Sequence, residues 1–191
     1  MQTTRSFIGI DLGPAASAAV ARLLQKLRGQ TSAVRWVEEQ QLHLTIKFLG
    51  ELDNVLLPGV CANLRAVCQH CEPFRLSLGE LGTFPRGKPP RVVWVGIDDP
   101  ESRLQALYER LDEAFVEYGL PRESRGFSPH LTLGRVKSQA DTLDLQTKFD
   151  QLPGLTATEF EVEEIHLLAS VKQGRTTQYE PIDTVELAGV M

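Results

Sequence analysis

The stretch QLHLTIKFLG, residues 41–50, places a histidine and a threonine two positions apart within an apolar run. In a β-strand, side chains at positions i and i+2 point to the same face of the sheet. We therefore predict that His43 and Thr45 project together from a strand. The alternate positions are then expected to face the core: Leu44, Ile46 and Phe48.

A second stretch, SPHLTLGRV at residues 128–136, repeats the centre of the first. Here His130 and Thr132 again stand two positions apart, about half a chain length after His43. The spacing suggests an internal duplication, with two α+β lobes that each carry one His-Leu-Thr strand. A pseudo-twofold axis would then bring both motifs to opposite walls of one cleft, although two short apolar motifs also match by chance.

Hydrophobic periodicity and turn residues predict alternating strands and helices along the whole chain. The expected strands cover residues 5–12, 33–39, 42–50, 74–84, 91–97, 130–136, 158–171 and 178–187. The expected helices cover residues 15–29, 54–71, 101–119 and 140–152. We predict an α+β fold with two pseudo-symmetric lobes of antiparallel sheet, outer helices and an active-site cleft between the lobes. Residues 1–191 would form one bilobal domain.

The composition is that of an ordinary globular protein, with 42% hydrophobic and 24% charged residues. No apolar run is long enough for a signal sequence or a membrane helix, so we expect a cytoplasmic protein without membrane contact. The net charge of -5 argues against a protein that coats long nucleic acid, and together with the absence of an apolar surface stripe it favours a monomer. Positive residues nevertheless gather in two segments, which favours a local anion site: Arg86, Lys88 and Arg91, and Arg122, Arg125 and Arg135.

Three cysteines follow one another closely, at Cys61, Cys68 and Cys71. The piece CQHC at residues 68–71 is not followed by a second pair of metal ligands. We interpret the cysteines as small residues on a helix and predict neither a metal site nor a cofactor.

Two histidines that face each other across a cleft are suited to acid-base chemistry near neutral pH. In an in-line displacement at phosphorus, one imidazole takes a proton from the nucleophile and the other protonates the leaving oxygen. The hydroxyls of Thr45 and Thr132 would donate to the non-bridging phosphate oxygens, and no metal is required. A lone strand histidine is more often a half-buried structural residue, which is how we interpret His166; the recurrence of both pairs argues against that reading for His43 and His130.

The two motifs resemble the paired His-x-Thr signatures of the 2H phosphoesterases. The similarity is greatest to the bacterial and archaeal RNA 2',3'-cyclic phosphodiesterases, also called 2'-5' RNA ligases. It extends to RSFIGIDL at the start and to EIHLLASVKQGRTTQYEPI near the end of the chain. The resemblance implies a phosphoric diester hydrolase that opens the 2',3'-cyclic phosphate at an RNA or oligonucleotide end to a 2'-phosphomonoester.

By the same resemblance, His43 is the proton donor to the leaving 3' oxygen and His130 is the base that activates water. Thr45 and Thr132 hold the phosphate, and Arg135 adds positive charge. Strict alternation places Arg135 on the face away from His130, so its role requires a bulge near Gly134.

Further substrate contacts are suggested by three side chains near the motifs. Phe84 and Phe127 would stack on a base, although packing under their loops is the more common role of such residues. Lys47 would contact a second phosphate if the strand alternation continues past Thr45. An exposed lysine without a partner is the more common outcome.

Other functions are compatible with the same residues. The reverse reaction, 2'-5' ligation, would use the same acid and base. A non-catalytic module that binds RNA ends or nucleotides would not need both histidines, and a purely structural domain would leave the paired motif unexplained.

Overall fold

The computed structural model of the protein describes residues 2–85, 89–120, 122, 126–137, 145, 149, 158–174 and 176–189. The predicted helix at 140–152 lies outside the described residues apart from Leu145 and Phe149, which are both buried. Arg86, Lys88 and Arg125 from the two predicted positive segments also lie outside them.

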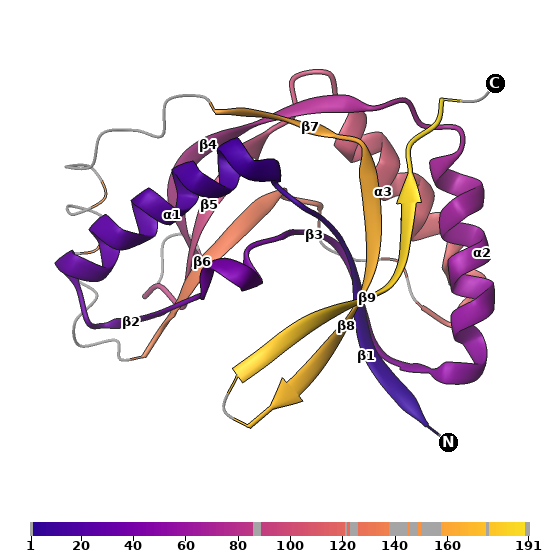
Figure 1. Ribbon diagram of the computed structural model, residues 1–191, viewed down its shortest axis with the longest axis horizontal. Helices are drawn as coiled ribbons and strands as arrows, with labels where there is room; N and C mark the ends of the chain where they lie inside the picture. Colours follow the sequence, from indigo (N-terminus) through magenta and orange to yellow (C-terminus); the bar gives the residue numbers. More distant parts are fainter. Residues whose placement is uncertain are drawn as a thin grey trace.

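Nine strands in the described part of the chain form two antiparallel sheets (Figure 1). The four-stranded sheet has the order β3-β1-β8-β9, and the five-stranded sheet has the order β2-β6-β5-β4-β7. Their bounds are β1 Thr3–Ile10, β2 Val34–Trp36, β3 Leu44–Asp53, β4 Phe74–Phe84, β5 Val92–Asp98, β6 His130–Val136, β7 Glu159–Val162, β8 Glu164–Gln173 and β9 Thr176–Glu186. The predicted α+β architecture with two lobes is confirmed, and β3 and β6 carry the two motifs in different sheets.

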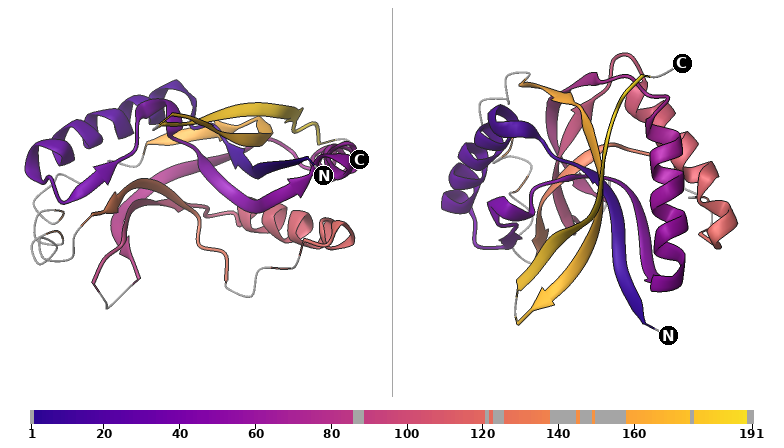
Figure 2. Two further views of the ribbon diagram at one scale, coloured as in Figure 1. Left: turned by 90° about the horizontal axis from the view of Figure 1, so that it is seen from below. Right: turned by 45° about the vertical axis from the view of Figure 1, so that its right-hand side comes forward.

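The two lobes are not the two halves of the chain. β2, β4 and β5 from the first half belong to the sheet that contains β6, whereas β8 and β9 from the second half complete the sheet that contains β3. In the left view of Figure 2, β8 and β9 lie in the upper layer and β4 to β6 in the lower layer. The duplication suggested by the motif spacing therefore does not divide the chain into an N-terminal and a C-terminal lobe.

In the described part of the chain, three helices pack on the outside of this assembly: α1 Gly13–Gln30, α2 Leu57–Cys68 and α3 Arg103–Ala114. The apolar residues of α1 recur at helical spacing and are buried: Ala16, Ala19, Val20, Leu23, Leu24 and Leu27. Helices α2 and α3 lie side by side, as Figure 1 and Figure 2 show. Among the described residues, no helix is long and apolar enough to cross a membrane.

The single strand predicted for residues 158–171 is wrong. The chain forms β7 in the five-stranded sheet and then β8 in the four-stranded sheet, with only Glu163 between them. The backbone carbonyl of Glu163 accepts a hydrogen bond from the N–H of Leu187 at 2.7 Å. Phe160 and Val162 alternate with glutamates, and the adjacent Glu163 and Glu164 then shift the apolar phase by one residue before Ile165. This phase shift coincides with the crossing between sheets.

A bulge in β3 overturns the predicted orientation of two side chains. Opposite β1, Ile8 pairs with Lys47 and Gly9 pairs with Thr45, so Ile46 is an extra residue in β3. The extra residue reverses the alternation: Phe48 is 67% exposed, whereas Lys47 is 3% exposed. Lys47 is ion-paired with Asp112 of α3 and does not share the face of His43 as predicted.

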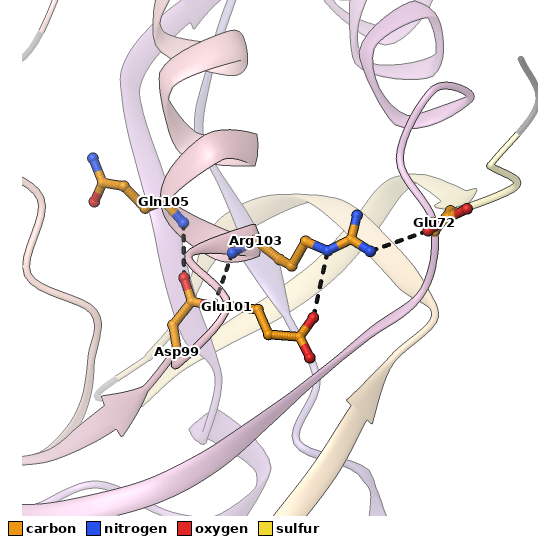
Figure 3. A network of polar contacts seen from close by, with 5 residues as sticks. All are labelled: Glu72, Asp99, Glu101, Arg103 and Gln105. Carbon is orange, nitrogen blue, oxygen red and sulfur yellow. Dashed lines mark hydrogen bonds and ion pairs between the residues drawn. The ribbon is translucent and has the colours of Figure 1, made fainter.

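The start of α3 is fixed by side chains from outside the helix (Figure 3). The Asp99 carboxylate accepts hydrogen bonds from the backbone N–H groups of Arg103 and Gln105, at 2.9 and 3.0 Å. These N–H groups have no partner within the helix, so the carboxylate satisfies them. The Arg103 guanidinium also pairs with Glu72 at 3.1 Å and with Glu101 at 3.6 Å. The network joins the start of α3 to the segment before β4.

Candidate active site

The two motif histidines are held in the same way. Nδ1 of His43 lies 2.8 Å from the carbonyl oxygen of Gln41, and Nδ1 of His130 lies 2.7 Å from the carbonyl oxygen of Ser128. A carbonyl only accepts, so Nδ1 carries the proton in both rings. In the neutral form this leaves the lone pair on Nε2. The two imidazoles are therefore oriented alike, and each can take up a proton at Nε2.

The two motif threonines also have similar surroundings. Thr45 and Thr132 are both half-buried. Within the described parts of the chain, neither hydroxyl has a hydrogen-bond partner. Each hydroxyl is thus available as a donor to an anion beside its histidine.

The structure brings the two motif strands together, since β3 contacts β6 between the sheets. The bulge that the role of Arg135 requires is present at Leu133. Trp94 of β5 pairs with Thr132 while Val93 pairs with Gly134, so Leu133 is an extra residue in β6. The extra residue shifts the alternation, and Arg135 is exposed. Its positive charge acts on Tyr179 of the other sheet: burial raises the pKa of the Tyr179 hydroxyl, and the charge of Arg135 opposes that shift in part.

Gly134 follows this bulge at a place where no side chain fits. A Cβ at this position would lie 2.5 Å from Cγ1 of Val34 and 2.9 Å from the carbonyl oxygen of Arg35. β2 therefore approaches β6 closely where the second motif ends.

Aromatic rings surround His43. The ring of Phe7 lies 4.6 Å from the imidazole between centroids, and the ring of Tyr179 meets it edge-on at 4.6 Å. Phe7 and Tyr179 also contact each other at 5.0 Å. Sequence reasoning missed both rings, because they are brought to His43 by distant parts of the chain. Phe7 lies on β1, which pairs with β3, and Tyr179 lies on β9, which meets the segment before β3 where the Gln41 amide donates to the Thr177 carbonyl.

A cavity of about 280 Å³ opens next to His43. Its polar lining includes Asp11, Gln40, His166 and Thr184. Nδ1 of His166 lies 3.0 Å from the Thr184 hydroxyl, and Nε2 lies 3.6 Å from the Asp11 carboxylate. The structure thus places His166 at the same cavity as His43, although no sequence motif marks it.

Burial lowers the pKa of His43 below its ordinary value of 6.5. The hydrogen bond to the Gln41 carbonyl and the negative charge of Asp11 oppose this shift in part. The neutral imidazole is consequently favoured in the free protein at neutral pH.

The two predicted stacking residues differ in their surroundings. The ring of Phe84, at the end of β4, meets His130 edge-on at 5.0 Å between centroids. Phe127 instead stacks in parallel on Tyr108 of α3 at 4.2 Å and packs against the core. The structure supports core packing for Phe127 and does not support the prediction that it stacks on a base.

The three cysteines lie outside this arrangement and are all free thiols. Burial raises the pKa of the Cys68 thiol to about 12. In the described ranges, no group of three or more histidine, cysteine or acidic side chains is placed to hold a metal ion.

Comparison with known proteins agrees with this geometry. Residues 14–174 match the family model of the 2'-5' RNA ligase superfamily. The chain belongs to this superfamily. Its members are 2H phosphoesterases, and this protein is accordingly an enzyme of that class.

Several relatives of this 2H phosphoesterase match over nearly their whole length. The RNA 2',3'-cyclic phosphodiesterase of Methanothermobacter thermautotrophicus is 32% identical over 94% of this chain and 95% of its own. The crystal structure of TT0787 of Thermus thermophilus has a TM-score of 0.82 at 28% identity, covering 97% of this chain and 98% of its own. E. coli LigT complexed with 3'-AMP has a TM-score of 0.78 at 28% identity, covering 97% and 99%.

Proposed function

We propose that this protein hydrolyses 2',3'-cyclic phosphate ends of RNA to 2'-phosphomonoesters by paired-histidine catalysis. The observation that carries the proposal is the matched setting of His43 and His130. Each donates Nδ1–H to a carbonyl two residues earlier, and each stands beside a threonine hydroxyl without a partner among the described residues. The relatives known as RNA 2',3'-cyclic phosphodiesterases support the choice of substrate.

In the proposed reaction, Nε2 of His130 takes a proton from water as the water oxygen attacks phosphorus. The bond between phosphorus and the 3' oxygen breaks, and His43 donates its Nε2 proton to that oxygen. The products are a 2'-phosphomonoester and a free 3' hydroxyl. His130 ends protonated and His43 neutral, and exchange with solvent restores both.

The low pKa of His43 fits this role once substrate is bound. The imidazole must carry a second proton to act as the donor, and burial opposes that charge in the free protein. A cyclic phosphate anion beside the ring raises its pKa by Coulomb attraction. Binding of the substrate therefore favours the protonated form of His43, which is the form that donates a proton to the leaving 3' oxygen.

The remaining side chains of the site stabilise the phosphate. Thr45 and Thr132 donate hydrogen bonds to the non-bridging oxygens, where charge accumulates in the transition state. Arg135 adds positive charge from the end of β6. Phe84 packs against the edge of His130 and limits its rotation. These groups supply acid, base and charge stabilisation without a metal ion or cofactor, and one chain carries all of them.

The first experiment measures hydrolysis of a short RNA with a 2',3'-cyclic phosphate end in excess EDTA. We expect the wild type to release a 2'-phosphate. His43→Ala and His130→Ala should each lower kcat by roughly 10²- to 10⁴-fold, the usual contribution of general acid-base catalysis. His70→Ala, an exposed histidine outside the site, is the matched control and should retain full activity.

Four results would contradict the proposal. Activity that EDTA abolishes would exclude the metal-free mechanism. Activity that is indifferent to both histidines would exclude their catalytic role. Tight binding of the RNA end without turnover would favour a binding module instead, while joining of a 5' hydroxyl strand would identify 2'-5' ligation by the same site.

A further inference from the structure

The ring of Phe48 is largely exposed to solvent. Of the large hydrophobic side chains that the structure describes as exposed, it is the only aromatic one. In the antiparallel pair, Phe48 lies opposite Phe7 and Thr45 lies opposite Gly9. Since Phe7 and Gly9 are two positions apart on β1, Phe48 and Thr45 face the same side of the sheet.

Phe48 is also close to the acid-base site. Its ring centroid lies 6.2 Å from that of Phe7, which in turn lies 4.6 Å from His43. One buried aromatic ring therefore separates the exposed ring from the catalytic imidazole. The bulge at Ile46 creates this position, because regular alternation would have turned Phe48 into the core.

A positive side chain accompanies Phe48 on the same face. Arg5 stands two positions before Phe7 on β1, so it also projects from the face that carries Thr45 and Phe48. It is exposed, and within the described residues it forms no ion pair. Its charge acts on Tyr179 together with that of Arg135, so it lies near the ring that contacts His43.

We infer that Phe48 and Arg5 form a second nucleotide subsite, which binds the nucleotide directly 5' to the terminal cyclic phosphate. The base of that nucleotide stacks on Phe48, and the phosphate that joins it to the terminal nucleotide pairs with Arg5. The inference rests on the proposed function, because it places an RNA strand along the sheet that carries His43. Proteins bind single-stranded nucleic acid with exposed aromatic rings, on which bases stack, and with nearby positive side chains, which contact the backbone. Since every base has a π face, the subsite accepts any base at this position.

The test compares 2',3'-cyclic AMP with the dinucleotide ApA that ends in a 2',3'-cyclic phosphate. The readout is the ratio of kcat/KM for the dinucleotide to kcat/KM for the mononucleotide, which cancels any general loss of folded enzyme. We expect this ratio to exceed one in the wild type. Phe48→Ala should lower it at least about fivefold, the lower end of what base–aromatic stacking contributes, whereas Phe48→Tyr should retain it.

Arg5→Gln tests the phosphate contact separately. It should lower the same ratio and reduce the salt slope of log kcat/KM for the dinucleotide by about 0.7, the value for one phosphate contact on a single strand. Val55→Ala is the matched control, because Val55 is also an exposed hydrophobic residue and lies just after β3. Its ratio should equal that of the wild type.

The outcomes separate this inference from the proposed function. Turnover of both substrates with an unchanged ratio in Phe48→Ala and Arg5→Gln would overturn the subsite and leave the proposed function standing. Absence of turnover for both substrates in the wild type would overturn the two together. If Phe48→Ala changed only the effect of an added 5'-hydroxyl oligonucleotide, the site would serve a second strand and the assignment would be wrong.

Discussion

At the scale of single residues, the protonation of His43 depends on opposing contributions from its neighbours. The rings of Phe7 and Tyr179 keep water away and favour the neutral imidazole. The Gln41 carbonyl and the Asp11 carboxylate favour the charged form. Because Asp11 also lies 3.6 Å from His166, one carboxylate acts on two histidines that are far apart in the sequence.

We predict that His43 titrates below pH 6.5 in the free enzyme and that Asp11→Asn lowers its pKa further. Removal of the negative charge withdraws a contribution that favours the imidazolium. The measurement is the chemical shift of the imidazole protons across a pH series, with Glu109→Gln on α3 as a control for the loss of one remote negative charge. A His43 pKa at or above 6.5, or one that Asp11→Asn raises, would contradict this account.

The same shift sets the direction of a stability change. Between the lowered pKa of His43 in the folded protein and 6.5 in the unfolded chain, the unfolded state binds more protons. The free energy of unfolding therefore keeps its full value above pH 6.5, as far as His43 is concerned. It decreases as the pH falls from 6.5 to the lowered pKa of His43 in the folded protein.

At the scale of elements, the buried pair of Lys47 and Asp112 joins the motif strand β3 to helix α3. We predict that Lys47→Met lowers the free energy of unfolding by about 3 kcal/mol or more, because the buried Asp112 carboxylate loses the positive charge with which it pairs. The double variant Lys47→Met with Asp112→Leu should recover most of this loss. The midpoint of urea unfolding measures both effects.

The exposed pair of Arg75 and Glu159 is the matched control for this experiment. Arg75→Met should change the free energy of unfolding by less than about 1 kcal/mol, as is usual for surface pairs. A loss of similar size in both single variants would show that burial is not what makes the Lys47 pair important.

Most elements and both motifs were predictable because their signals are local. The apolar alternation of residues 74–84 gave β4 with its observed bounds, and the HLT triplets identified His43 and His130 as a pair. What the sequence could not give is set by contacts between distant strands. The bulge that exposes Phe48 follows from pairing with β1, and the place of His166 in the cavity follows from the order of four strands. His166 lacks the His-x-Thr spacing, so no local signal distinguished it from a structural histidine.

At the scale of the whole molecule, both sheets take strands from both halves of the chain. β1 lies between β3 and β8, and β6 lies between β2 and β5. We predict that fragments 1–119 and 120–191 do not fold when each is made alone, because each lacks central neighbours in both sheets. Circular dichroism with urea unfolding should show no cooperative transition for either fragment. A cooperative transition in one fragment would show that a lobe forms from one half of the chain.

Co-expression of the two fragments is the complementary measurement. Once both are present, β3 and β6 can meet, and hydrolysis of the cyclic phosphate should return. The intact chain serves as the reference for the recovered rate.

The interleaved sheets also determine when the enzyme becomes active during its synthesis. A chain grows from its N-terminus, so His43 leaves the ribosome long before β8 and β9, whose Tyr179 completes the surroundings of its imidazole. A partly made chain holds the first motif beside an unfinished sheet. If the proposed reaction needs the complete surroundings of His43, we expect hydrolysis of RNA ends to begin only after translation has passed β9.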